Sequence, residues 1–457
     1  MSEAPGSFVA PSAGAAAGRA RQPIQPVRGM NDVLPADVGA WQYLEQVARG
    51  LLAAYGYEEI RVPIVEHTEL FHRSIGEYTD IVEKEMYSFQ DVGGDQLTLR
   101  PEATAGIARA MISNGLLRGA RHKLWCTGPM FRHERPQQGR YRQFYQIDVE
   151  ALGFPGPDVD VELIGLGARL WRQLGLTRVR LVVNSLGTAA ARAAYRGVLV
   201  EYLRAHEAEL DADSRRRLGG NPLRILDSKN PDMRALIEAA PLLTEYLDEE
   251  SRVHFQGLCG ALDDMGIPYS INPRLVRGLD YYSRTVFEWV TDALGAQDAV
   301  CSGGRYDGLI AQLGGDSTPA IGFALGVERC VALMRQAGQV PGAAPPELYI
   351  VASGPPAERA AARLAELLRD ALPGRAVRVN LGGGNFKTQF RRADRSGARL
   401  ALILGDEELA RGVAAVKPLR REGGQSDCPL AELPARIVSL LEQEPPGAVA
   451  TEEIGRS

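Results

Sequence analysis

Long apolar runs and clustered cysteines are both missing from this sequence. No stretch approaches the roughly 20 apolar residues that cross a bilayer, and no secretory h-region is evident. The five cysteines lie far apart without a C-x-x-C pair, so neither a disulfide framework nor a four-cysteine zinc site is expected. A reducing, cytoplasmic location fits this cysteine usage best.

A surplus of positive charge is absent as well. The formal net charge is -5, which argues against a general nucleic-acid coat but leaves room for a local basic patch that binds RNA. His67 and His72 are five residues apart, lack the H-E-x-x-H spacing and have no evident third ligand. We therefore expect no zinc site.

At 457 residues the chain is too long for one ordinary core, so two or three domains are expected. Residues 1–21, rich in Ala, Gly, Ser and Pro, predict a disordered tail, and residues 443–457 predict a flexible C-terminus. The arginines of the tail leave a transit peptide as an alternative. The clearest linker is AGQVPGAAPPE, at 337–347.

Hydrophobic spacing predicts the main elements. Residues 41–55 have helical spacing that ends at Gly56, and 95–111 and 319–336 each predict a strand that turns into a helix. Residues 123–134 and 141–152 predict a hairpin, and 274–290 has strand character. Polar helical patterns fill 188–266, an inserted subdomain, whereas strands and helices alternate in the α/β segment 347–442.

The return arm of the hairpin carries an unusual set of side chains. Because side chains alternate along a strand, one face of this arm holds Arg142, Phe144, Gln146, Asp148 and Glu150. A solvated surface is the plain interpretation of such a row. However, Phe144 offers a ring for base stacking and Arg132 on the other arm suits a phosphate. Together they indicate a ligand with an anion, a base and an N–H-bearing part.

Similar mixtures of arginines, acids and aromatics recur on other predicted strands. They comprise Arg100, Glu102 and Thr104; Arg277, Asp280, Tyr281, Tyr282 and Arg284; and Glu328 with Arg329. Each cluster alone is weak, because an arginine near a helix start usually lies on the surface. Their repetition favours one shared site.

The residues that carry these clusters resemble class II aminoacyl-tRNA synthetases, and within that class the histidyl-tRNA synthetase family. GPMFRHERPQQGRYRQFYQ resembles motif 2, AIGFALGVERCVALM resembles motif 3, and the segment around Pro63 resembles motif 1. LVRGLDYYSRTVFEW and LTLRPEATAG are similar to signatures of the histidyl enzymes. The resemblance runs from about residue 28 to 418.

The resemblance implies a fold and a reaction. It implies an α+β catalytic domain over 22–338, with an antiparallel sheet flanked by helices and the helical insertion at about 188–266. An α/β anticodon-binding domain follows at 347–442. The implied enzyme is a homodimer that activates L-histidine with ATP and Mg²⁺ to histidyl-adenylate, then charges the 3′ end of tRNA(His).

The resemblance also implies a role for individual residues. Arg277 and Arg132 would be catalytic, and ATP would contact Arg132, Arg140, Phe144 and Arg329. Histidine would contact Glu102, Ala103, Thr104, Gln146, Glu150, Tyr281, Tyr282 and Tyr306. Ala103 stands where many relatives have glycine. A carboxylate and a phenol suit an imidazole, since each ring nitrogen needs a partner.

The sequence leaves two rival functions open and contains one misleading motif. A non-catalytic paralogue would regulate another enzyme, such as ATP phosphoribosyltransferase, but would be expected to lose the arginines and the last domain. A synthetase for threonine or proline is the second rival, against which Glu150 and RGLDYY argue. GGGNFKT resembles a P-loop, but Phe386 replaces its last glycine, so no nucleotide role is expected there.

Overall fold

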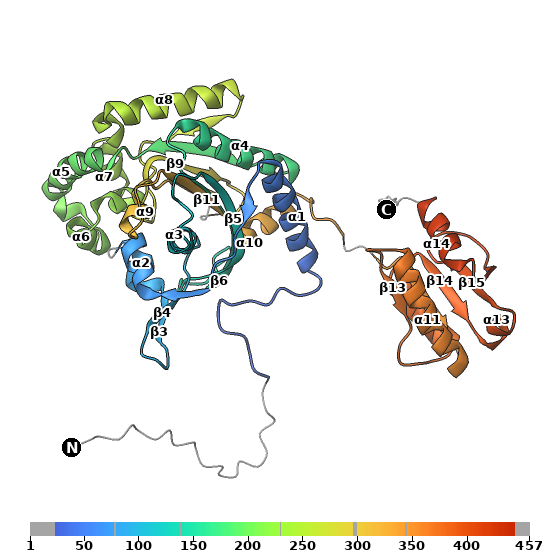
Figure 1. The fold of residues 1–457 in the computed structure, drawn as a ribbon. Coiled ribbons are helices and arrows are strands. Elements are labelled where there is room, and N and C mark those ends of the chain that lie inside the picture. The colour runs from blue at the N-terminus through green and yellow to red at the C-terminus, as the bar shows by residue number, and fades with distance from the viewer. Residues whose placement is uncertain are drawn as a thin grey trace, which may run out of the picture. The chain divides into compact units, whose positions relative to one another are not determined.

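The structure is a computed structural model that describes residues 23–76, 79–137, 139–228, 230–295, 299–342 and 345–443. The predicted tail at 1–21 and nearly all of the predicted flexible end at 443–457 lie outside these ranges. The chain forms two compact units that divide between Pro341 and Gly342 (Figure 1). None of the described helices is long and apolar enough to cross a membrane.

The first unit is built on a large, curved, mixed sheet (Figure 1). Among the described residues its eight strands follow the order β1 (Glu58–Glu59), β5 (His122–Phe131), β6 (Gln143–Leu152), β11 (Ala320–Gly326), β10 (Ala299–Arg305), β9 (Ser283–Val290), β7 (Arg180–Ser185) and β8 (Tyr269–Ile271). The central pairs are antiparallel, as predicted, whereas β1 with β5 and β7 with β8 are parallel edge pairs.

One face of this sheet is covered by helices. They are α1 (Val38–Ala54), α4 (Pro157–Gln173), α8 (Glu249–Asp264) and α10 (Val327–Gln336). Ile147 and Val149 of β6 point into this core, together with Phe287 of β9 and Phe323 of β11. Because side chains alternate along β6, Gln146, Asp148 and Glu150 face the opposite side. The helices therefore leave one sheet face for the site.

The other face of the sheet carries α3 (Thr104–Ser113), visible inside the curve in Figure 1, and a small sheet. The small sheet has the order β2 (Val65–His67), β4 (Gln96–Leu99) and β3 (Tyr87–Gln90). Nearby lie α2 (Thr68–Ile75), the π-helix η1 (Ile81–Glu85) and α9 (Leu309–Gln312). The predicted strand-to-helix turn at 95–111 is confirmed by β4 and α3.

The predicted helical segment at 188–266 is helical throughout its described elements. These are α5 (Ala189–Ala205), η2 (Glu207–Glu209), α6 (Ala212–Gly219), η3 (Pro222–Asp227), η4 (Pro231–Met233), α7 (Arg234–Ala239), η5 (Leu243–Tyr246) and α8. Asp248, Asp211 and Thr188 cap α8, α6 and α5 by accepting backbone N–H bonds.

The strand prediction for 274–290 is only half right. Strand β9 begins at Ser283, and the preceding residues form a loop after Pro273. Arg284 has a φ of 47°, a left-handed conformation that is uncommon outside glycine. Because this stretch is not extended, its side chains do not alternate as the sequence suggested, and Arg277 and Asp280 take different surroundings.

The second unit has its own five-stranded sheet in the order β13 (Val377–Val379), β12 (Leu348–Ala352), β14 (Leu400–Leu404), β15 (Val413–Pro418) and β16 (Ser426–Pro429). Its helices are α11 (Pro355–Ala371), α12 (Phe386–Arg395), α13 (Asp406–Ala410) and α14 (Leu433–Glu442). Strand β12 is parallel to β13 and β14, as expected for an α/β pattern. Asn385 caps α12, so the P-loop-like segment is a glycine turn before a helix.

Candidate active site

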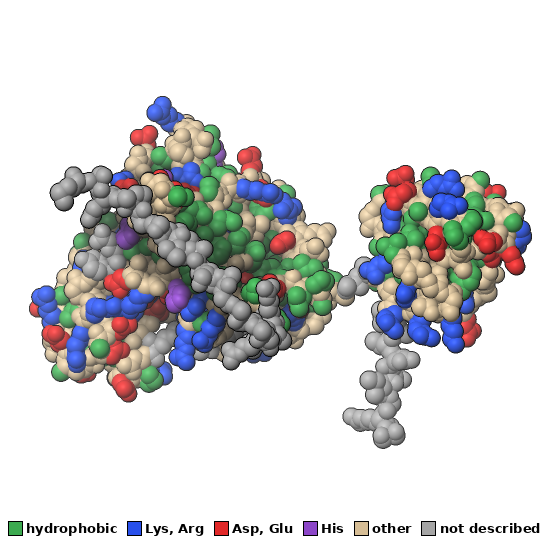
Figure 2. All heavy atoms as spheres, turned by 90° about the horizontal axis from the view of Figure 1, so that it is seen from below, with side chains coloured by type: hydrophobic (Ala, Val, Ile, Leu, Met, Phe, Trp, Pro, Cys, Tyr) green, Lys and Arg blue, Asp and Glu red, His purple; other side chains and the backbone are tan. Residues whose placement is uncertain are grey.

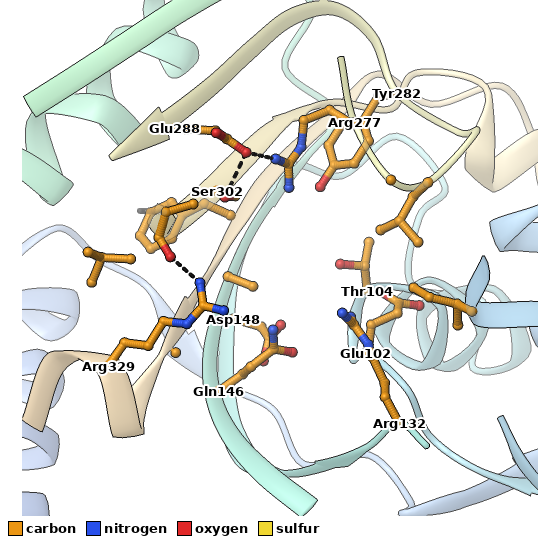
Figure 3. A pocket seen from close by; sticks show the side chains of 18 of the residues that line it. Glu102, Thr104, Arg132, Gln146, Asp148, Arg277, Tyr282, Glu288, Ser302 and Arg329 are labelled. Atoms are coloured by element: carbon orange, nitrogen blue, oxygen red, sulfur yellow. Dashed lines mark hydrogen bonds and ion pairs between the residues drawn. The ribbon is translucent and has the colours of Figure 1, made fainter. Parts of the chain in front are cut away.

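A cavity of about 510 Å³ opens on the face of the large sheet opposite α1, α4, α8 and α10. Its lining includes eleven of the residues to which the resemblance gives a role: Glu102, Thr104, Arg132, Arg140, Phe144, Gln146, Arg277, Tyr281, Tyr282, Tyr306 and Arg329. Figure 3 shows Arg277, Arg329 and Arg132 approaching the same space from three sides. Residues almost 200 positions apart thus share one site.

The arginines around the cavity are held by neighbouring groups. Arg132 donates from Nε to the carbonyl of Pro101 at 2.8 Å, and its guanidinium lies 5.3 Å from the centre of the Phe144 ring. Arg329 donates from Nε to the carbonyl of Gly139 at 3.1 Å and also bonds the carbonyl of Ala299.

Two further arginines pair with carboxylates. Arg140 pairs with Glu134 at 3.1 Å. Arg277 donates to Glu288, which also accepts a bond from Ser302 at 3.3 Å (Figure 3). Arg277 Nε has no partner among the described groups. This arginine therefore keeps a donor for a ligand.

A cluster of buried acids lies beside the arginines. Glu102, Asp148 and Glu150 are all at most 4 % exposed. Burial raises the pKa of each carboxyl, to about 8 for Asp148. Glu102 accepts the backbone N–H of Ala105 at 2.9 Å, at the start of α3. Buried acids with raised pKa values are frequent at functional sites.

Glu150 sits beneath the cavity rather than on its wall. Its carboxylate accepts hydrogen bonds from Thr104 at 2.6 Å and from the hydroxyl of Tyr306. Gly322 pairs with Glu150 across the sheet, and a Cβ at this glycine would collide with the carboxylate. The glycine thus makes the space that the acid fills.

Three tyrosines form an aromatic wall near Glu150. The ring centroids of Tyr281 and Tyr282 are 4.7 Å apart, and those of Tyr281 and Tyr306 are 5.7 Å apart. Arg277 lies 5.3 Å from the centre of the Tyr282 ring. The wall combines apolar faces with hydroxyl groups, which suits a planar ligand carrying polar nitrogens.

Several residues that the sequence grouped with the site lie elsewhere. Arg100 is 4 % exposed and bonds the carbonyls of Pro129 and Val62, at 3.0 and 3.1 Å, so it ties strands together. Asp280 accepts a bond from Asn221, and Arg284 pairs with Glu250 at 2.6 Å, because the chain turns before β9.

Ala103 also lies away from the cavity. It is fully buried and packs in the core beside α3 with Ile107 and Met111.

Sequence reasoning missed Glu288 and Ser302, which line the cavity. Their meeting depends on the pairing of Ser302 with Glu288 across β10 and β9. The available signal was the single acid within TVFEWV, because a charge in a buried strand needs a partner. The described residues hold no group of three or more potential metal ligands of the His, Cys, Asp or Glu type.

Comparison with known proteins identifies the family. A family model described as histidyl-tRNA synthetase matches residues 29–330, and one described as anticodon binding domain matches 347–440. A histidine–tRNA ligase of Alkalilimnicola ehrlichii is 59 % identical over 402 residues, covering 88 % of this chain and 93 % of that protein. These matches show that the chain belongs to the histidyl-tRNA synthetase family of class II aminoacyl-tRNA synthetases.

Solved structures agree with this assignment. The apo histidyl-tRNA synthetase of S. aureus matches with a TM-score of 0.77 and 36 % identity, over 91 % of this chain and 99 % of that chain. An ATP phosphoribosyltransferase regulatory subunit/histidyl-tRNA synthetase from Bacillus halodurans matches with a TM-score of 0.59 and 21 % identity, over 84 % and 98 %. The second likeness concerns the fold alone.

Proposed function

We propose that the cavity performs both steps of the histidine–tRNA ligase reaction to which family membership points. L-Histidine and ATP first form histidyl-adenylate and pyrophosphate, and the histidyl group then passes to the 3′ end of tRNA(His). One observation carries this proposal: Arg132, Arg277 and Arg329 surround a cavity whose remaining wall holds acids and phenols. A triphosphate needs the arginines, and a cationic amino acid needs the acids and phenols beside them.

The ATP half comprises Arg132, Arg140, Phe144 and Arg329. Arg132 is assigned to the α-phosphate and Arg329 to the γ-phosphate side, because guanidinium forks match phosphate oxygens. The adenine stacks on Phe144. Mg²⁺ enters with ATP as part of the substrate and neutralises triphosphate charge.

Arg277 is assigned to the reacting centre. The carboxylate of histidine attacks the α-phosphate, and two anions that approach each other repel. A fixed cation between them lowers this repulsion most at the transition state. Its pairing with Glu288 and its unpartnered Nε describe a guanidinium that is oriented and still able to bind.

The histidine half comprises the acids and the tyrosines. Glu102, Thr104 and Gln146 are assigned to the ammonium group, and Glu150 with Tyr282 to the two imidazole nitrogens. Tyr281 and Tyr306 line this pocket, and Ala103 packs in the core beneath Glu102 and Thr104. Each carboxylate oxygen of Glu150 has two lone pairs, so its bonds to Thr104 and Tyr306 leave capacity for a ring N–H.

We further propose a cytoplasmic homodimer with a catalytic domain over 22–338, an inserted helical subdomain at about 188–266 and an anticodon-binding domain at 347–442. Apolar side chains that lie exposed in or beside the motif 1 and small-sheet segments support dimerisation: Ile64 (42 %), Val65 (38 %) and Phe89 (44 %). Figure 2 shows hydrophobic side chains gathered on one face of the first unit. Sedimentation velocity tests the dimer, and a monomer at micromolar concentration contradicts it.

ATP–pyrophosphate exchange with each of the twenty amino acids tests the function. Stimulation by histidine alone is expected. Stimulation by threonine or proline would indicate a different synthetase. Silence with every amino acid would indicate a regulatory paralogue, although the retained arginines and second unit favour the enzyme.

A further inference from the structure

Asp148 lies on the floor of the cavity, and none of the roles above is assigned to it. It belongs to a row of side chains that crosses the sheet at one level. The register pairs Asp148 of β6 with Ala324 of β11, Ala324 with Ser302 of β10, and Ser302 with Glu288 of β9. All of these residues line the cavity. The small Ala324 leaves a gap between Asp148 and the pair of Glu288 with Arg277.

The carboxyl group of Asp148 is buried without compensation. It is 1 % exposed, and its Oδ2 has no hydrogen-bond partner among the described residues. A buried carboxylate normally has a cation or several donors, since desolvation otherwise costs several kcal/mol. A buried carboxyl group that faces a cavity and lacks a partner gains one from a ligand that enters the cavity.

The charged neighbours of Asp148 indicate which kind of ligand group would bind it. After burial, Glu102 acts most strongly on Asp148 and raises its pKa, whereas Arg100 and Arg132 lower it. The other titratable side chains that interact with it are Glu150 of the same strand, Cys126 of β5 and Cys301 of β10. Two acids that repel each other beside a cavity make a site for a cation.

The spacing along β6 places this cation. Asp148 lies between Gln146, assigned to the ammonium group, and Glu150, assigned to the imidazole, and each step of two residues spans roughly 7 Å. We propose that Asp148 is a further substrate-binding residue, whose carboxylate binds the ammonium group of histidine together with Glu102. This inference rests on the proposed function. It leaves the carboxylate of histidine to point across Ala324 towards Arg277.

Calorimetric titration of Asp148→Asn with matched ligands tests the assignment. Histidine and histidinol both carry the ammonium group, whereas 3-(imidazol-4-yl)propionate carries the ring and carboxylate without it. Above about pH 8, the pKa of Asp148, wild-type protein carries a negative charge here, whereas the variant keeps the shape of the side chain without that charge. We expect about tenfold or greater weakening for histidine and histidinol, and less than twofold for the propionate, because a hydrogen bond to a charged group contributes about 1.5–3 kcal/mol.

Cys126→Ala is the matched control. Cys126 pairs with Asp148 across the sheet and is 1 % exposed, so this change perturbs the packing of the same row without altering its charge. Equal affinities of Asp148→Asn and wild type for histidine would overturn the assignment. Equal weakening for all three ligands would also overturn it, because that pattern indicates distortion of the pocket.

The titrations separate this inference from the proposed function. If wild-type protein binds histidine and supports histidine-dependent exchange, the function stands whatever the variant shows. If wild-type protein binds none of the three ligands, the function itself fails. Retained binding of the propionate by Asp148→Asn shows that the variant is folded.

Discussion

Two arginine–carboxylate pairs, each with one residue in the large sheet, have opposite surroundings. Arg305 and Asp160 are both fully buried and joined at 2.7 Å. Arg305 also bonds the carbonyl of Phe154 at 3.0 Å, the carbonyl of Gly156 and the carboxylate of Asp307 at 3.2 Å. Arg277 and Glu288 are 15 % and 20 % exposed, and Arg277 Nε is unpartnered.

The difference separates Arg305, which stabilises the fold, from Arg277, which we propose acts in the reaction. The donors of Arg305 bond Asp160 of α4, Asp307 and two carbonyls of the connection between β6 and α4, so none remains for a ligand. Arg277 is oriented by one carboxylate and keeps donors that face the cavity. The number of satisfied donors, together with the lesser burial of Arg277, distinguishes the two arginines.

The largest effect is expected on stability, from Arg305→Met. Removing Arg305 takes the guanidinium from the buried carboxylate of Asp160, which keeps its bond to His254, and loss of one partner of a buried pair costs about 3–5 kcal/mol. Thermal unfolding should show a clear loss, and Arg305→Lys, which keeps the charge without the fork, should fall between. An unchanged melting temperature for the methionine variant would contradict the structural role.

Arg277→Ala should have the largest effect on activity. Loss of an oriented charge-stabilising donor commonly lowers a rate by about 10²–10³, so histidine-dependent exchange should nearly vanish. The melting temperature and the dimer should be retained, because Arg277 ties few elements together. Normal exchange by this variant would refute its catalytic role.

Glu288→Gln tests whether orientation of Arg277 matters. The amide keeps the shape but weakens the pairing, and we expect about a tenfold fall in kcat with little change in the KM for histidine. Ser302→Ala removes one bond to the same carboxylate and should have a smaller effect. A rise in KM at constant kcat would instead assign Glu288 to substrate binding.

Glu150→Gln should weaken histidine binding more than ATP binding, by several-fold, because the charged acceptor for the ring N–H is lost. The KM values for both substrates in exchange provide the measurement. Equal changes in the two constants would count against the assigned contact.

A smaller, pH-dependent effect extends the comparison to the acids. Burial acts to raise the pKa of Asp160, but the His254 bond and the Arg305 charge outweigh it and leave this pKa below its usual value. Asp160 therefore stabilises the fold above about pH 4, and this contribution is lost as the pH falls through its lowered pKa.

The pH dependence of the contribution of Asp148 to stability has the opposite sign. Its pKa is raised to about 8, so its contribution is full below about pH 4 and is lost as the pH rises towards 8. The melting temperature of ligand-free Asp148→Asn, relative to wild type, should therefore increase between about pH 4 and 8 and level off above that. A difference that does not vary with pH would show that Asp148 does not titrate in this range.

Local patterns predicted the hairpin and the helices α1 and α10, because alternation and helical spacing depend on neighbours in the chain. They also assigned Phe144, Gln146 and Glu150 to one face, which the structure confirms. They failed at Arg100 and Asp280, whose partners come from distant segments. They also missed Glu288, which joins the site through the register of several strands.

Gly322 constrains how this pocket can change. Any side chain at that position would take the volume now held by the carboxylate of Glu150, so the two positions cannot vary independently. A variant with alanine at 322 would require a shorter or absent acid opposite it, and with it a different amino acid in the pocket. Redesign of amino-acid preference therefore has to treat these two sites as one joint choice.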